Sequence, residues 1–162
     1  MSEKRYITRV GFERFQKELE HLWNVERRKV VSEVEAAAAH GDRSENAEYT
    51  YGKRRLREID RRVRYLSKLL EEATVVDPAE RGAVTKAYFG AWVTVEDEDG
   101  EETTYQLVGR DEFDAGAGRI SLDSPLGKAL LGRKVGDAVT FRRPLGDLEV
   151  TIVSIEPMPP DA

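Results

Sequence analysis

The feature that most constrains this chain is an apolar stripe between residues 56 and 70. Its members recur every three or four positions, which is the period of a helix that packs against another helix. They are Leu56, Ile59, Val63, Leu66 and Leu70. A helix with one narrow apolar stripe needs a partner to bury it.

A second stripe earlier in the chain supplies that partner. Its members are Phe12, Phe15, Leu19, Leu22, Val30, Val34 and Ala37. The eleven residues from Leu19 to Val30 break the repeat, and we interpret them as a stutter that locally unwinds the supercoil. Thr8 is the expected N-cap of this first helix. Because only a short segment separates the stripes, the sequence predicts an antiparallel coiled-coil hairpin over residues 1–76, with its tip at 41–49.

The expected helices differ near the tip. An alanine tract, Ala36 to Ala39, approaches it on the first helix, and its small side chains predict a close approach of the two helices. On the second helix Gly52 stands behind the tip, where it costs about 1 kcal/mol relative to alanine.

The tip itself is acidic. Gly41 fits the end of the first helix, and Asp42 to Glu45 resemble the start of the second. Two interpretations stay open at this point. Asp42 and Glu45 form a capping box, or they form part of an Mg²⁺ site that a partner completes, since Mg²⁺ prefers oxygen ligands. One acid can cap while the other coordinates.

Behind the tip the second helix is rich in arginine. Five basic residues, Arg54, Arg57, Arg61, Arg64 and Lys68, repeat in parallel with the apolar stripe and are predicted to face solvent. This row suits a phosphate backbone. The alternative is a solvated face held by the pairs Arg54–Glu58 and Glu58–Arg62. Aromatic residues do not alternate with the basic row, so base stacking is not indicated.

Beyond residue 76 the pattern changes. Residues 77–82 have the composition of a linker. Residues 83–157 then alternate with a period of two, which predicts a small antiparallel sheet that contains two hairpins, at 92–108 and 139–155. One short helix is expected at 126–131, with Ser124 as its N-cap and Pro125 in its first turn. We expect the aromatic residues of this domain to form a core, with a ligand groove as the alternative. These aromatics are Tyr88, Phe89, Trp92, Tyr105 and Phe141. Residues 158–162 are expected to be a disordered tail.

Charge also divides the chain. Residues 1–75 carry a balance of +3, whereas residues 76–162 carry −8, which suggests two domains with different partners. The chain has no cysteine, which excludes disulfides and thiolate metal sites. The first residues lead into no apolar region, so we expect no signal peptide. Because no apolar run is long enough for a membrane helix, we also expect a cytoplasmic protein that does not contact membranes.

Several long motifs carry a family resemblance. The run G-D-R-S-E-N-A-E-Y-T-Y from Gly41, the run L-R-E-I-D-R-R-V-R-Y-L from Leu56, and the segments at 89–92 and 123–131 resemble the bacterial Gre-type transcript cleavage factors, closest to the GreB branch. The resemblance implies a coiled-coil hairpin followed by an FKBP-like domain. It also implies that the protein binds RNA polymerase, inserts the hairpin into the secondary channel and stimulates cleavage of backtracked nascent RNA at its 3′ end.

The resemblance assigns roles by motif position. Asp42 and Glu45 are expected to act in the polymerase active site and to share an Mg²⁺ ion there, with Asn46 and Tyr49 in support. No cofactor is expected to bind tightly to the protein alone. RNA contact is expected from Arg43, Lys53, Arg54, Arg57, Arg61 and Arg64. Polymerase docking is expected from Asp123, Ser124 and Pro125.

The expected protein is a monomer and not an enzyme by itself, because the polymerase performs the cleavage. DNA binding is a further expectation. Two alternatives keep the fold but change the function. One is an inhibitor that occupies the secondary channel without stimulating cleavage. The other is a peptidyl-prolyl isomerase or chaperone that acts through the FKBP-like domain.

Overall fold

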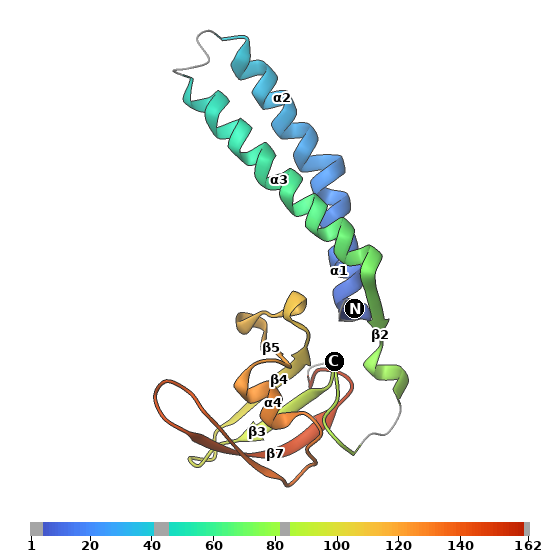
Figure 1. Cartoon of the computed structure of the whole chain (residues 1–162), viewed down its shortest axis with the longest axis vertical. Helices are drawn as coiled ribbons and strands as arrows, with labels where there is room; N and C mark the ends of the chain where they lie inside the picture. The colour runs from blue at the N-terminus through green and yellow to red at the C-terminus, as the bar shows by residue number, and fades with distance from the viewer. Residues whose placement is uncertain (1–4, 41–45, 82–84, 161–162) are drawn as a thin grey trace. The chain divides into compact units, whose positions relative to one another are not determined.

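The computed structural model describes residues 5–40, 46–81 and 85–160 (Figure 1). The chain divides into two compact units. The hairpin unit comprises Phe12–Ala73, and the sheet unit combines Met1–Gly11 with Thr74–Ala162. The predicted domain boundary at residue 76 does not set the start of the chain apart. The structure groups it with the C-terminal half, which Arg5 and Thr8 contact through Asp111 and Glu112.

The hairpin unit has two antiparallel helical arms, as predicted (Figure 1). The first arm consists of α1 (Arg9–His21), a π-helical turn η1 (Leu22–Glu26) and α2 (Arg27–Ala38). The second arm is the single helix α3 (Ala47–Glu72). The π-helical turn lies inside the interval where the stutter was predicted, because a wider turn absorbs the residues that break the repeat.

The apolar stripes meet in the seam between the arms. The side chains that the structure buries there are Phe15, Leu22, Val30, Ala37, Ile59, Leu66 and Leu69. Leu56, Val63 and Leu70, which were also predicted in the seam, are only half-buried. Leu69 lies inside in addition, so the apolar face near the base of α3 is broader than a strict heptad stripe.

Two short strands precede and follow the hairpin. β1 (Arg5–Thr8) pairs with β2 (Ala73–Val76), and neither was predicted from the sequence. Thr8 is the N-cap of α1, as predicted, since its Oγ1 accepts a hydrogen bond of 3.1 Å from the backbone N–H of Gly11.

Glu112 holds this cap in place. Its carboxylate accepts hydrogen bonds of 2.6 Å from the backbone N–H and from the hydroxyl group of Thr8, and the Glu112 side chain is buried. A Cβ atom added at Gly11 would lie within 2.6 Å of the same carboxyl group. The start of α1 is therefore built into the sheet unit, with glycine required at Gly11.

The sheet unit contains a five-stranded sheet with the order β5-β4-β3-β7-β6 (Figure 1). Its strands are β3 (Trp92–Glu96), β4 (Glu102–Val108), β5 (Arg119–Ser121), β6 (Ala138–Phe141) and β7 (Leu148–Glu156). The short helix α4 (Pro125–Leu130) follows β5. Both predicted hairpins and the predicted helix are confirmed to within a residue or two.

One pairing differs from the prediction of a wholly antiparallel sheet. β5 runs parallel to β4, with Leu107 opposite Ile120. The reversal is possible because residues 109–118 form a long connection containing the 3₁₀ turns η3 (Arg110–Glu112) and η4 (Ala115–Ala117). A tight hairpin would have forced the antiparallel arrangement.

The core of the sheet unit is mainly aliphatic. Among the predicted core aromatics only Tyr88 is buried, and the other four are half-buried. The buried residues of this core are Ala87, Tyr88, Ala91, Val93, Val95, Leu107, Leu130, Val139, Val150 and Ile152. Four of the five rings therefore lie around a mainly aliphatic centre, and Tyr88 is part of it.

The predicted linker and tail are only partly described. Pro78–Arg81 form a 3₁₀ turn, η2, and Asp77 accepts a hydrogen bond of 3.0 Å from the backbone of Ala79. Residues 158–160 contain no helix or strand, and the last two residues are outside the described part. In the ranges that the structure describes, no helix has the length and apolar character needed to cross a membrane.

Candidate functional site

Asn46 joins the two arms at the tip. It is the N-cap of α3, because its Oδ1 accepts a hydrogen bond of 3.1 Å from the backbone N–H of Tyr49. Its Nδ2 donates across the hairpin to the carbonyl oxygen of Ala37, at 2.7 Å. One amide side chain thus satisfies an open donor of one helix and an acceptor of the other.

This geometry corrects the predicted start of the second helix. α3 begins at Ala47, after the extended backbone of Asn46, and not at Asp42 to Glu45. The capping role proposed for Asp42 belongs to Asn46, since Asn, Asp and Ser are comparable N-caps and only one position can precede the first helical turn. Gly41, Asp42, Arg43 and Glu45 themselves lie outside the described residues.

Gly52 allows the arms to approach closely behind the tip. It is buried, and a Cβ atom there would lie 2.6 Å from Cγ2 of Val34. Ala37, one turn further along α2, is buried as well. The sequence suggested that Gly52 weakens the helix, but the structure gives it a packing role that depends on the opposite helix. The predicted close approach of the arms is confirmed.

Four arginines form a row on the outer face of α3, here called the outer row. They are Arg54, Arg57, Arg61 and Arg64, and all are exposed. Among the residues that the structure describes, none of them has an ion-pair partner, so the predicted pair Arg54–Glu58 is wrong. Lys68 continues the row and is also exposed.

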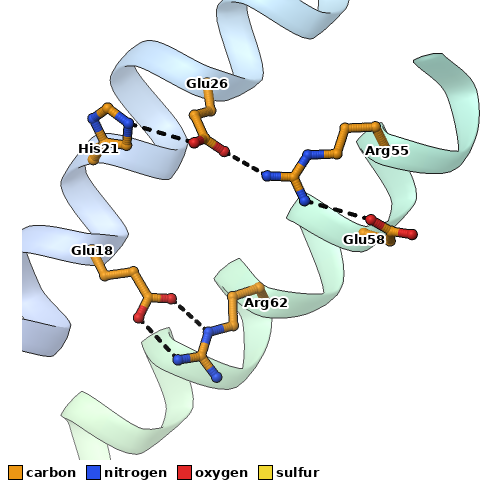
Figure 2. A network of polar contacts seen from close by, with 6 residues as sticks. All are labelled: Glu18, His21, Glu26, Arg55, Glu58 and Arg62. Carbon is orange, nitrogen blue, oxygen red and sulfur yellow. Dashed lines mark hydrogen bonds and ion pairs between the residues drawn. The ribbon is translucent and has the colours of Figure 1, made fainter. Parts of the chain in front are cut away.

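Arg55 and Arg62, here called the paired arginines, reach across to the first arm (Figure 2). Arg62 makes a two-pronged contact with Glu18, at 2.6 and 2.9 Å, and replaces the predicted pair with Glu58. Arg55 binds Glu26 at 2.7 Å and Glu58 at 3.5 Å. The contacts of Arg55 and Arg62 lie about two turns apart along α3 and join the arms at two points.

The Arg62 contact also acts on its charge. The hydrogen bonds that Arg62 donates to the Glu18 carboxylate raise the pKa of Arg62 above its ordinary value, against the opposing effect of desolvation. A third cross-arm pair, Arg27 with Asp60 at 2.8 Å, lies on the other flank of the seam, so ion pairs join the arms on both sides of it.

Two further expected residues contact each other. The ammonium group of Lys53 lies 5.9 Å from the centre of the Tyr49 ring, within the range of a cation–π contact. Tyr49 is half-buried and Lys53 is exposed. Lys53 therefore remains accessible to a partner, and its contact with Tyr49 directs its side chain toward the tip.

The predicted docking residues form the turn before α4. Ser124 is the N-cap, since its Oγ accepts from the backbone N–H of Gly127 at 3.1 Å and donates to the carbonyl oxygen of Ser121 at 2.6 Å. Pro125 occupies the first helical turn, and both Asp123 and Pro125 are exposed. A Cβ atom at Gly127 would overlap the Ser121 carbonyl, so this turn is compact and presents Asp123 and Pro125 outward.

An open groove of about 430 Å³ lies in the sheet unit, lined by Thr85, Lys86, Ala87, Tyr88, Phe89, Leu131 and Gly132. It corresponds to the ligand groove considered as an alternative. Its lining offers backbone groups, one lysine, the hydroxyl-bearing residues Thr85 and Tyr88, and apolar side chains. Among its lining residues no acid–base pair or nucleophile is arranged for catalysis.

The expected Mg²⁺ ligands are carboxylates, which match the oxygen donors that this ion prefers. Within the described ranges, no group of three or more His, Asp or Glu side chains is placed to hold a metal ion. Asp42 and Glu45 are outside those ranges, so the metal remains a proposal.

Comparisons with known proteins identify the family. Residues 5–75 match the family model described as "Transcription elongation factor, N-terminal". Residues 82–157 match the one described as "Transcription elongation factor, GreA/GreB, C-term". The chain belongs to the GreA/GreB family of transcription elongation factors.

Individual relatives refine this assignment. The chain is 51% identical to GreB of Yersinia pestis over 161 residues, which cover 99% of this chain and 94% of the relative. It is 53% identical to GreB of Pasteurella multocida over 148 residues, which cover 90% and 92%. The predicted resemblance to the GreB branch is confirmed, and the chain is a GreB-type transcription elongation factor.

A solved GreA/GreB factor from Nitrosomonas europaea is 26% identical, with 94% of this chain and 99% of that chain covered and a TM-score of 0.42. The assignment does not depend on this loose superposition. The names of the relatives give no support to the expectation of DNA binding.

Proposed function

We propose that this GreB-type factor binds RNA polymerase through the secondary channel and stimulates the polymerase's own cleavage of backtracked RNA. The observation that carries the proposal is the outer row, an exposed line of four guanidinium groups on a braced hairpin. Such a row suits a phosphate backbone. Because the chain belongs to a family of transcription elongation factors, RNA is the expected source of those phosphates.

Asp42 and Glu45 are the proposed acidic groups at the tip. They would hold an Mg²⁺ ion together with ligands from the polymerase, and that ion would supply charge stabilisation for phosphodiester cleavage. The contribution of this chain is positioning. Asn46 joins the last turn of α2 to the first turn of α3, so the two helix ends on either side of the acidic segment are held together.

Asp123, Ser124 and Pro125 are the proposed docking residues. The hydrogen bonds of Ser124 hold the turn rigidly, which leaves Asp123 and Pro125 as the groups that a polymerase surface can contact. Asp123→Ala should weaken binding to polymerase without unfolding the domain. A competition assay against wild type measures this, with Asp99→Ala, another exposed aspartate of the sheet unit, as the control.

The deciding experiment is a cleavage assay on a purified backtracked polymerase complex. Asp42→Ala and Glu45→Ala should each abolish stimulated cleavage while binding to polymerase survives. Glu48→Ala is the matched control, since Glu48 is an exposed acid in the first turn of α3 but not one of the proposed pair. Full cleavage by both tip variants would refute the mechanism.

The same assay separates the alternative functions. A channel-occupying inhibitor would bind the complex and slow elongation, yet the wild-type protein would release no RNA fragment. An isomerase acting through the groove at Thr85 to Phe89 would accelerate proline isomerisation in a peptide without any polymerase present.

A further inference from the structure

Tyr51 is an exposed aromatic residue beside the outer row. It is the fifth residue of α3, close behind the tip, and 69% of its surface is exposed. Trp23 is the other strongly exposed aromatic residue of the described hairpin, and the Arg27 guanidinium carbon lies 5.1 Å from the centre of its ring. No comparable ring or cation contact of Tyr51 occurs among the described residues. Its apolar surface is thus available to a partner.

Tyr51 lies at one side of a groove between the arms. The groove has a volume of about 220 Å³ and is lined by Glu26, Lys29, Val30, Glu33, Tyr51 and Arg55. Its charges cancel in pairs, because Arg55 contacts Glu26 at 2.7 Å and Lys29 contacts Glu33 at 4.0 Å. A neutral groove with apolar surface from Val30 and Tyr51 favours an uncharged planar group over a phosphate.

The outer row begins next to this groove. Arg54 follows Tyr51 by three residues, so the two side chains are about 60° apart around the helix. A single strand whose phosphates lie along the outer row would therefore have its bases within reach of Tyr51. Charged groups that contact phosphates and an aromatic face that contacts a base are the two components of sequence-tolerant single-strand binding.

We propose that Tyr51 is a positioning residue that stacks on a base of single-stranded RNA while the outer row holds its phosphates. This inference rests on the proposed function, which brings extruded RNA to the hairpin. It revises the expectation from sequence, which required several aromatics along the basic row. A single exposed ring beside the row is sufficient for one stacked base.

The first test uses the full-length protein and a single-stranded oligoribonucleotide that contains 2-aminopurine, at low salt. Wild type and Tyr51→Phe should quench the fluorescence on binding, since both keep a ring for stacking. Tyr51→Ala should bind about fivefold or more weakly and quench less. Alanine favours helix more than tyrosine does, so α3 should stay intact, which circular dichroism checks.

Trp23→Ala is the matched control, because it removes an exposed ring of the first arm that already has a cation–π contact with Arg27. It should behave as wild type. Equal quenching by Tyr51→Ala and wild type would overturn the inference, whatever the outcome of the cleavage assays.

The second test uses backtracked complexes that differ in the length of extruded RNA. Tyr51→Ala should need about fivefold or more protein for half-maximal cleavage when the extruded RNA is long, and the wild-type amount when it is short. An equal loss at both lengths would overturn the inference and indicate that Tyr51 contacts the polymerase instead. Absence of cleavage with wild type would refute the proposed function, and the fluorescence test would still decide the role of Tyr51.

Discussion

α3 carries arginines of two kinds within a few turns of one helix. Arg55 and Arg62 lie on the flank next to the seam and bind acids of the first arm (Figure 2). Arg54 and Arg61, each adjacent to one of them in sequence, are exposed. A step of one residue turns a side chain by about 100°, which is enough to change a structural arginine into one that a ligand can reach. Residue type thus says less about role here than angular position does.

The largest effect should come from the seam itself. Leu66 is fully buried, so Leu66→Ala should lower the free energy of unfolding by about 2–5 kcal/mol. Lys68→Ala, two residues further on the exposed face, should change it by less than about 0.5 kcal/mol. Chemical denaturation measures both. Comparable losses would mean that the two faces of α3 are not distinct.

The next effect concerns the close approach at Gly52. Gly52→Ala should destabilise the hairpin by about 1 kcal/mol, because the contact with Val34 outweighs the better helix propensity of alanine. In a Val34→Ala background the same substitution should become stabilising, since the clash is gone. A loss of equal size in both backgrounds would contradict the packing role of Gly52.

A smaller effect should distinguish the two kinds of arginine. Arg62→Gln should cost about 0.5–1 kcal/mol at low salt and less at high salt, because the pair with Glu18 is partly exposed. Arg61→Gln should leave the free energy of unfolding unchanged. A double-mutant cycle with Glu18→Gln isolates the pair. A zero coupling energy would show that the pair contributes no stability.

The smallest effect on stability should accompany a change in RNA binding. Arg57→Gln should unfold as wild type does, yet reduce the slope of log K against log salt by about 0.7 for single-stranded RNA. Arg55→Gln should leave that slope nearly unchanged, since its guanidinium group is already paired. Equal slopes for wild type and Arg57→Gln would remove Arg57 from the RNA-facing surface.

The sequence predicted what depends on periodicity. The seam of Phe15, Ile59 and Leu66, the hairpins of the sheet and the capping roles of Thr8 and Ser124 all follow from patterns within one segment. The outer row was also predicted, because its offset from the seam is a matter of spacing alone.

Features that depend on distant partners were not predictable. Gly52 resembled a defect until Val34 was placed opposite it. Asn46 caps α3 where the sequence placed the cap at Asp42, because the two side chains have similar capping chemistry. Glu112 stands among charged neighbours in sequence, yet it is buried because Thr8 supplies its hydrogen bonds. Tyr51 belongs to no periodic pattern, and the exposure on which its proposed role depends is visible only in the structure.

The contact between Thr8 and Glu112 has a consequence for biosynthesis. The sheet unit is discontinuous in sequence, with the hairpin inserted between residues 11 and 74. A ribosome releases Thr8 early, and Glu112 follows 104 residues later. At about 5–20 residues per second the interval is roughly 5–20 s. During that time β1 can already pair with β2, but Thr8 still lacks the carboxylate of Glu112. The hairpin is therefore complete before the N-cap at its base is secured.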